Sequence, residues 1–360
     1  MDPIKEALTF DDVTLAPKYS SVLPSEVNTS VKLSKNLNLK IPLLSSAMDT
    51  VTESKMAIEI AKAGGIGVIH RNLSINDQIL EIKKVQKKGL VVGAAVGTND
   101  TELSRAEKII KCKVDLIVVD TAHGHTKRVA NIIKFIKKKK SNKTALCAGN
   151  IATAEAAKFL CKLGVDIVKV GIGPGSICTT RLVAGIGVPQ LSALLDVKKG
   201  LTKNVKMISD GGVKFSGDIA KALAAGADAV MVGSMIAGTN EAPGKIIKKN
   251  GKLFKVFRGM GSVGAMNKGS ADRYFQKKQK DSSKYVPEGV EGLIKYKGGV
   301  SKIIFKLSGG LKSSMGYLGS KNVINLRNKP NFVKITKAGF YESMVHSIDE
   351  VKKNSQYLWW

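Results

Sequence analysis

Eight short runs rich in Val, Ile, Leu and Ala recur along this chain, and segments with helical spacing separate most of them. The runs begin at Ile41, Gly65, Leu90, Val114, Thr144, Val165, Val205 and Ala227. Strands that alternate with helices predict βαβ units and a parallel sheet, and runs this apolar predict that both sheet faces are covered. Eight units predict an α/β protein with a closed (β/α)8 barrel, the TIM barrel. The alternative is a doubly wound open sheet, but a convincing G-x-G-x-x-G fingerprint after the first strand is missing.

The helical segments before four of the runs end in "AGG", "CKVD", "LGVD" and "AGAD". Glycine at such a position is typical of a helix C-terminus. The few residues that remain before the next run match the short loop that returns the chain to a parallel strand. The repeat therefore supports the barrel.

Polar residues follow the runs at the point where each predicted strand ends. They include His70, Asp120, Asn150 and Asp210. In a barrel the carboxyl ends of the strands meet at one rim, where active sites are built. Polarity also resumes wherever a buried strand ends, but that alternative does not explain why Asp, Asn and His gather there. The sequence therefore predicts a functional site at this rim.

One of the four cysteines lies outside the predicted strands and helices. Cys178 follows the stretch "VGIGPG" (residues 170–175), whereas Cys147 falls in a strand and Cys112 and Cys161 fall in helix ends. Glycines let the backbone approach a ligand and expose N–H groups, so a thiol there can be a nucleophile. The alternative is an inert packing cysteine. The absence of CxxC spacing favours reduced intracellular thiols over disulfides or zinc.

Two glycine-containing turns close the last two runs. They are "ISDGG" (residues 208–212) and "VGS" (residues 232–234). The loops after strands seven and eight of such barrels commonly hold a phosphate through backbone N–H groups. Asp210 would repel a phosphate and is better suited to accept hydrogen bonds from ribose hydroxyls. A nucleoside monophosphate satisfies both requirements.

The formal net charge of +29 raises a nucleic-acid partner as an alternative. The lysines are spread along the chain, and the short run at 137–140 has no interleaved aromatic residues. A solvated lysine-rich surface, or an anionic small substrate, is therefore favoured over nucleic acid. No apolar run reaches the roughly 18 residues of a membrane span, and the N-terminus lacks an apolar signal core. The expected location is the cytoplasm, with no membrane partner.

Long motifs in a fixed order then carry a resemblance to a known family. They are "SSAMDTVTE" (45–53), "DTAHGHT" (120–126), "GIGPGSICTTR" (171–181), "ISDGG", "FRGMGSVGAM" (257–266), "DRYFQ" (272–276) and "VPEGVEG" (286–292). Together they closely resemble the IMP dehydrogenase family over about residues 8–345. The resemblance implies NAD-dependent oxidation of IMP to XMP, the committed step of guanine nucleotide synthesis. Cys178 would form a covalent thioimidate with the purine, which water then releases.

The resemblance also implies roles for individual residues. Thr180, Arg273 and Tyr274 would act with Cys178, the Arg273–Tyr274 pair by activating water. IMP would be bound by Ser45, Met48, Ser176, Asp210, Gly211, Gly212, Gly233, Ser234, Phe257, Arg258, Gly259, Met260, Gly261 and Glu288. NAD would meet Asp120, Thr121, Ala122, Asn150, Gly171, Ile172 and Gly173. Because a guanidinium is normally always protonated, the alternative for Arg273 is a phosphate or carboxylate clamp.

A monovalent cation, potassium, is implied as well. Carbonyl oxygens of Gly173, Gly175 and Cys178 would coordinate it, and carbonyls suit a hard monovalent ion. Glu342, Ser343 and Met344 of a neighbouring subunit would complete the site, as in the homotetramers usual for the family. Met344 stands where the family usually has histidine, a change that main-chain ligation could survive.

We expect residues 1–360 to form a single catalytic domain. The region 252–300 interrupts the strand–helix rhythm and is rich in Gly, Lys and Ser, which predicts a mobile active-site flap. Many family members carry a tandem CBS regulatory module between the second and third barrel strands. Between residues 71 and 90 this chain has room for one helix only, so the module is predicted to be absent.

Two other activities stay open at this point. GMP reductase shares the cysteine loop and converts GMP to IMP with NADPH, but it needs no water-activating flap, so "DRYFQ" and "VPEGVEG" favour the dehydrogenase. A non-catalytic nucleotide- or RNA-binding barrel is supported by the positive charge alone.

One departure from the family pattern concerns the substrate. Phe257 stands where the family usually has tyrosine, which predicts the loss of one hydroxyl contact to the phosphate of IMP.

Overall fold

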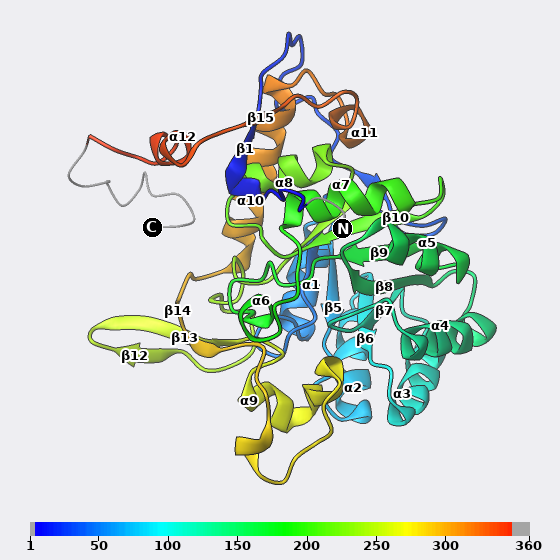
Figure 1. The fold of residues 1–360 in the computed structure, drawn as a ribbon. Coiled ribbons are helices and arrows are strands. Elements are labelled where there is room, and N and C mark those ends of the chain that lie inside the picture. The colour runs from blue at the N-terminus through cyan, green and yellow to red at the C-terminus, as the bar shows by residue number, and fades with distance from the viewer. Residues whose placement is uncertain (1–3, 348–360) are drawn as a thin grey trace.

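The computed structural model describes residues 4–347 and has a closed barrel of eight parallel strands at its centre (Figure 1). The strands are β4 (Leu43–Ser45), β5 (Ile66–Ile69), β6 (Val92–Val96), β7 (Leu116–Asp120), β8 (Ala145–Ile151), β9 (Ile167–Val170), β10 (Lys206–Asp210) and β11 (Ala229–Val232). Each strand pairs with the next in the chain, and β11 closes the barrel against β4. The predicted (β/α)8 barrel is confirmed. The "YLWW" end of the sequence lies outside the described residues.

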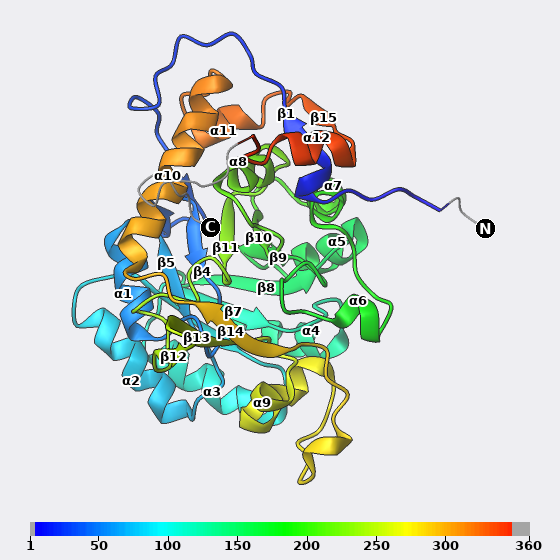
Figure 2. The same ribbon diagram turned by 90° about the vertical axis from the view of Figure 1, so that its left-hand side faces the viewer.

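Helices form the outer layer around this barrel (Figure 2). They are α1 (Ser54–Lys62), α2 (Ile75–Gln86), α3 (Asp100–Lys111), α4 (Lys127–Lys139), α5 (Ala154–Lys162), α7 (Gln190–Gly200), α8 (Ser216–Ala224) and α10 (Val300–Tyr317). In α4, Val129, Ile133 and Ile136 are buried and the lysines lie on the other face, as a 3.6-residue period requires. No helix within residues 4–347 is long and apolar enough to cross a membrane.

The repeated helix endings have the predicted conformation. Gly64, Gly164 and Gly226 follow α1, α5 and α8 and have positive φ angles of 93°, 74° and 119°. This left-handed conformation is the one that glycine adopts without steric cost at a helix C-terminus. Lys113 takes the same conformation after α3, with φ 55°.

The aspartates that recur at the strand starts have a structural role at the opposite rim from the pocket. Their carboxylates accept backbone N–H bonds of 2.8–2.9 Å from the neighbouring strand: Asp115 from Val92, Asp166 from Leu146 and Asp228 from Met207. These bonds fix the amino ends of adjacent strands relative to one another. The aspartates that stabilise the barrel therefore lie at the amino ends of its strands, and the polar residues of the pocket lie at the carboxyl ends.

Strand alternation sorts the barrel side chains into two sets. Leu44, Val118 and Ile208 belong to a cluster inside the barrel. Their neighbours Leu43 and Val119 belong to the larger cluster between the strands and the helices. Because successive residues point to opposite faces, a residue's parity decides whether its side chain reaches the barrel interior.

The connection between β5 and β6 consists of α2 and short flanking turns. This single-helix connection is the one that the sequence predicts between the second and third barrel strands.

An antiparallel sheet follows the barrel, and the sequence analysis did not predict it. It consists of β12 (Ile247–Lys249), β13 (Lys252–Arg258) and β14 (Glu291–Lys295). Lys255 and Phe257 are buried at alternate positions of β13, a period of two that the lysines hide in the sequence. Residues 259–290, here named the flap segment, connect β13 to β14 and contain only short helical pieces such as α9 (Val263–Ala265). Of the range 252–300 in which we expect a flap, the strands β13 and β14 occupy part, and the flap segment is what lies between them. The mobility of this segment remains a prediction.

The first and the last strand of the described chain pair with each other. β1 (Val13–Leu15) pairs with β15 (Phe332–Lys334), and α12 (Lys337–Glu342) follows. Both ribbon views separate α12 from α6 (Thr180–Val183), the short helix after the cysteine loop (Figures 1 and 2).

Candidate active site

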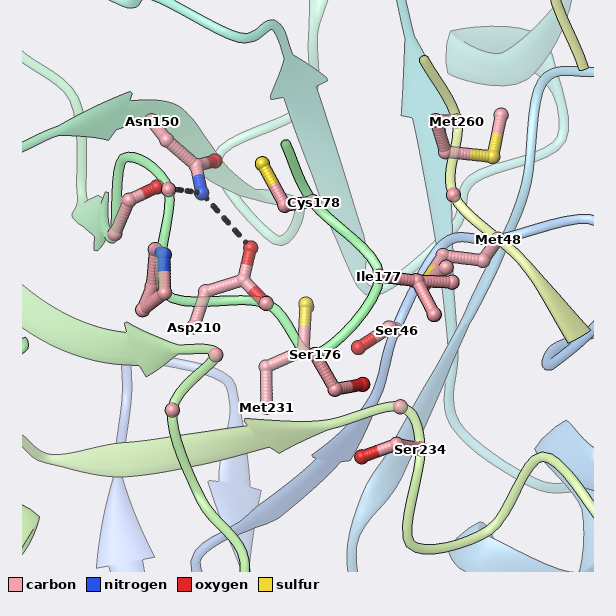
Figure 3. Close-up of a pocket in the computed structure, with 18 of the residues that line it drawn as sticks. Ser46, Met48, Asn150, Ser176, Ile177, Cys178, Asp210, Met231, Ser234 and Met260 are labelled. Carbon is pink, nitrogen blue, oxygen red and sulfur yellow. Dashed lines mark hydrogen bonds between the residues drawn. The ribbon is translucent and has the colours of Figure 1, made fainter. Parts of the chain in front are cut away.

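A pocket opens at the carboxyl ends of the barrel strands, the rim at which the sequence predicts a site. Most of the predicted site residues line it: Met48, Asp120, Asn150, Gly171, Gly173, Gly175, Ser176, Cys178, Asp210, Gly211, Gly212, Gly233, Ser234, Phe257, Gly259, Met260, Arg273, Tyr274 and Glu288. Figure 3 shows Cys178, Asn150 and Asp210 on one side of this pocket and Met48 and Met260 on the other. The chain therefore brings residues from all seven motifs of the resemblance to one cavity.

Cys178 lies on the loop that follows β9, and glycines shape that loop. Gly171 has φ 149°, and a Cβ there would lie 2.0 Å from the carbonyl oxygen of Asp210. Gly173 has φ 82°, a conformation that disfavours other residues. The Cys178 thiol donates a hydrogen bond of 3.2 Å to Oγ1 of Thr180, at the start of α6. The loop thus presents the sulfur at the pocket with a hydroxyl beside it.

The end of the flap segment holds the cysteine loop in place. Thr179 donates its backbone N–H to the carbonyl of Glu288 at 3.0 Å, and Val290 donates to the carbonyl of Ile177 at 3.0 Å. Cys178 lies between them, bridged to Gly289. The position of the thiol therefore depends on the "VPEGVEG" motif, which is more than 100 residues away in the sequence.

The other cysteines have the inert surroundings that the sequence predicts for packing residues. Cys147 is buried in β8, and this burial raises the pKa of its thiol to about 12. Burial also raises the pKa of Cys112. A protonated thiol is a poor nucleophile, so neither group competes with Cys178 for chemistry.

Four charged side chains meet at the floor of the pocket. The ammonium of Lys169 lies 3.0 Å from Oδ1 of Asp120 and 2.5 Å from Oδ2 of Asp210. Arg273 forms an ion pair with the other oxygen of Asp120, and Asn150 donates to Oδ2 of Asp210 at 3.0 Å. Burial alone would raise the pKa of Asp120, but the two cations outweigh it and lower that pKa to about 2. Asp120 is therefore ionised at neutral pH.

Arg273 is a cation in this arrangement. Burial would lower the pKa of its guanidinium, but the carboxylate of Asp120 outweighs burial and raises that pKa above its ordinary value. Burial raises the pKa of the neighbouring Tyr274 hydroxyl, which stays protonated. This geometry matches the carboxylate-clamp alternative for Arg273. Activation of water by Arg273 remains a prediction and requires the guanidinium to leave Asp120.

Several predicted residues do not border the pocket: Ser45, Thr121, Ala122, Ile172, Thr180, Arg258 and Gly261. Ser45 is fully buried in β4, and a Cβ on Gly67 would meet both its hydroxyl and Ala57 of α1. Strand parity therefore turns Ser45 outward toward the helices, and its neighbour Ser46 lines the pocket instead. Thr121 is also buried, and its hydroxyl donates to the carbonyl of Gly149 at 2.7 Å.

Arg258 is directed to a protein carboxylate. Its Nη2 lies 2.5 Å from Oδ2 of Asp49, and its Nε lies 3.1 Å from both oxygens of that side chain. The pair joins β13 to the loop after β4. Arg258 therefore fixes the backbone next to the pocket through its ion pair with Asp49, and its contact with a phosphate remains a prediction.

Lys169 is the main residue that the sequence analysis missed. It lies in the stretch "VDIVKV", which we assigned only to a buried strand. A lysine inside an otherwise apolar strand is the signal that could have revealed it, since buried lysines are rare unless they are paired.

The predicted potassium ligands fit the proposed site only in part within one chain. Gly173, Gly175 and Cys178 lie on one loop, although the carbonyl of Gly175 already accepts the N–H of Cys178 at 3.1 Å. Glu342 ends α12, and Ser343 and Met344 follow it, in the region that both ribbon views separate from α6. A complete site would need these residues from a second copy. No cluster of His, Cys, Asp and Glu within residues 4–347 is suited to a metal ion.

Phe257 lines the pocket and is 6% exposed. The resemblance implies that this pocket binds IMP, and replacing Phe257 with tyrosine is then expected to lower the Michaelis constant for IMP about fivefold, because a new hydroxyl–phosphate bond is worth about 1 kcal/mol. Steady-state kinetics at saturating NAD measure this change. An unchanged constant in a variant of normal thermal stability would refute the proposed contact.

Together, the closed barrel and the cysteine loop at its carboxyl rim define a (β/α)8-barrel enzyme with a cysteine in its pocket. Residues 7–346 match the IMP dehydrogenase / GMP reductase domain. The chain is 47% identical to inosine-5'-monophosphate dehydrogenase of Borreliella burgdorferi, covering 96% of this chain and 98% of that protein. It is 45% identical to the Cryptosporidium parvum enzyme of that name, covering 98% of each chain, and 39% identical to the Bacillus subtilis one, with the same coverage. The chain belongs to the IMP dehydrogenase / GMP reductase family.

The alignment with the Bacillus subtilis protein extends over 482 positions, more than the 360 residues of this chain. The alignment with the Borreliella burgdorferi protein extends over 395 positions. Both relatives therefore contain residues that this chain lacks, and the Bacillus subtilis protein contains many more of them.

Proposed function

We propose that this chain oxidises IMP to XMP with NAD, a step of guanine nucleotide synthesis, through a covalent adduct on Cys178. The observation that carries the proposal is the position of Cys178, on a glycine-rich loop that lines the same pocket as Asp210. The names of the relatives at 45–47% identity support it.

The reaction divides into two steps. The thiol of Cys178 would lose its proton as its sulfur bonds to C2 of the purine, and the hydrogen at C2 would leave as hydride to the nicotinamide ring of NAD, which would be reduced. Water then adds to C2 and loses a proton, the C–S bond breaks, and XMP and the free thiol remain. Splitting a difficult substitution in this way lowers each barrier.

Asp210 is proposed to bind the ribose of IMP. The bonds from Asn150 and Lys169 both reach its Oδ2, so the ribose hydroxyls would bind at Oδ1. Backbone N–H groups at Gly212, Gly233 and Ser234 would bind the phosphate. A carboxylate for the hydroxyls and amides for the phosphate match the charges of a nucleoside monophosphate.

Asp120 is proposed to bind the ribose of NAD, and Arg273 now occupies that carboxylate. The ribose of NAD and the guanidinium of Arg273 cannot both bind the same carboxylate oxygen of Asp120 at the same time. We therefore propose that the flap segment withdraws Arg273 when NAD binds and returns it for hydrolysis, when water must be activated. Arg273 and Tyr274 come from "DRYFQ", the motif that favours the dehydrogenase over GMP reductase.

Three further properties belong to the proposal. A homotetramer would bring Glu342, Ser343 and Met344 of a second copy to the cysteine loop to complete a potassium site. The single catalytic domain would act in the cytoplasm, which the four free cysteines support. No nucleic-acid partner is proposed.

The test mixes the purified protein with IMP, NAD and potassium and follows reduced nicotinamide by its absorbance. We expect steady turnover and XMP as the product, with weaker activity when sodium replaces potassium. A parallel reaction with GMP and NADPH is expected to be inactive. Oxidation of NADPH with GMP, together with no reaction of IMP, would favour the reductase. Salt-sensitive RNA binding without either reaction would favour a non-catalytic barrel.

A further inference from the structure

Lys169 is a buried lysine at the floor of the pocket, and the proposed reaction has no use for it as a reacting group. It is 2% exposed, although it lies in an apolar strand. Ile167 of the same strand faces the barrel interior, and residue 169, two positions on, has the same parity. On β8, a Cβ at Gly149 would lie 2.4 Å from the carbonyl oxygen and 2.8 Å from the Cβ of Lys169, so glycine lets the two strands approach this closely. The side chain of Lys169 lies inside the barrel and lines the pocket.

The three N–H donors of the ammonium have three acceptors. They are Oδ1 of Asp120 at 3.0 Å, Oδ2 of Asp210 at 2.5 Å and the side-chain oxygen of Asn150. Burial would lower the pKa of Lys169, but the two carboxylates outweigh it and raise that pKa. Lys169 is therefore a cation at neutral pH. What it can do is hold the two carboxylates.

The two cations beside Asp120 are anchored differently. Lys169 projects from a barrel strand that pairs with β8 and β10. Arg273 lies in the 3-10 turn Ala271–Tyr274 of the flap segment. Asp210 forms an ion pair with Lys169, whereas Arg273 pairs with Asp120. If the flap segment withdraws, the barrel still supplies one positive charge to both carboxylates.

We propose that Lys169 is a positioning residue that holds the carboxylates of Asp120 and Asp210 in the orientation that the ribose groups of NAD and IMP need while Arg273 is withdrawn. This rests on the proposed function and deepens it. Two carboxylates that share one site disfavour each other's ionised form unless a cation lies between them. Without Lys169, Asp120 would depend on Arg273 alone, which would favour the closed flap segment and oppose NAD. Asp210 would lose the charged bond that orients its carboxylate.

The experiment compares Lys169→Met and Lys169→Arg with the unmodified enzyme. Lys255→Met is a matched control, because Lys255 is also a buried lysine but its ammonium donates to the backbone carbonyls of Thr239 and Ala242, outside the pocket. Michaelis constants for IMP and NAD, kcat and the melting temperature are measured for each protein. We expect Lys169→Met to raise both Michaelis constants about tenfold or more, the size of effect that the loss of a charge-assisted hydrogen bond produces. Lys169→Arg should restore most of the loss.

The control separates positioning from stability. Lys255→Met is expected to lower the melting temperature and to leave both Michaelis constants within about twofold. If Lys169→Met lowers the melting temperature but also leaves both constants within that range, Lys169 has a structural role only and the proposal is wrong. A Lys169→Arg variant with constants no better than those of Lys169→Met would also contradict it, since its charge is retained.

A second pair of variants keeps the test decisive if Lys169→Met does not fold. Asp120→Asn with Lys169→Met removes one anion and one cation together, and its IMP dissociation constant is compared by calorimetry with that of Asp120→Asn alone. We expect about tenfold weaker IMP binding in the double variant, because Asp210 has lost its partner. Equal constants would overturn the proposal. The unmodified enzyme serves in parallel: if it fails to turn over IMP with NAD, the proposed function is wrong, whereas the calorimetric comparison still tests Lys169.

Discussion

Replacing Cys178 with alanine is expected to lower kcat for IMP oxidation by more than about 1,000-fold, because removal of a nucleophile leaves only binding and orientation. Alanine keeps the loop backbone, whose shape comes from Gly171 and Gly173 and from the bonds to residues 288 and 290. IMP binding should therefore stay within a few-fold of normal. Turnover is followed by the absorbance of reduced nicotinamide, and IMP binding by calorimetry.

Mass spectrometry gives an independent readout of the same step. The unmodified enzyme, quenched during turnover, should carry the mass of the purine nucleotide on the peptide that contains Cys178, and the alanine variant should not. Cys161→Ala is the control, since Cys161 lies in α5 and does not line the pocket. Normal turnover by the Cys178 variant would remove the covalent route and with it the proposed mechanism.

Replacing Arg273 with alanine is expected to separate the two chemical steps. Hydride transfer needs Cys178 and the two substrates, whereas hydrolysis is proposed to need the returning guanidinium. The variant should release a burst of reduced nicotinamide close to one per active site, followed by turnover slowed about 100-fold or more, the range of a lost general base or acid. Rapid-mixing absorbance measures both phases.

The same variant also tests the clamp on Asp120. Without Arg273, Lys169 remains as the counter-ion of Asp120, so the Michaelis constant for NAD should fall or stay unchanged. Lys278 is an exposed residue of the same flap segment, and the control variant Lys278→Ala is expected to have the kinetics of the unmodified enzyme. A slow variant without a burst would place Arg273 in the first step and contradict the proposed division of labour.

Much of the fold follows from patterns that act over short distances. The eight strands, the glycines that end their helices and the single helix between β5 and β6 depend on neighbouring residues, so the sequence predicts them. The β13–β14 pair was not predicted, because a lysine at the buried position 255 hides the alternation of β13 and the 32 residues of the flap segment separate the two strands. Ser45 was assigned to the substrate for a similar reason: a motif marks the neighbourhood of a site but not the face of the strand.

The sequence by itself determined which residue types end each strand, and therefore that a thiol, carboxylates and glycine turns lie at one rim. Only the tertiary structure decided their partners: Lys169 between Asp120 and Asp210, Arg273 on Asp120, and Arg258 on Asp49 rather than in the pocket. Backbone propensity and strand parity are local properties that a sequence carries directly. Ion pairs between residues 41 to 209 positions apart depend on how the strands close into a barrel and where its loops return, and that is set by the packing of the whole chain.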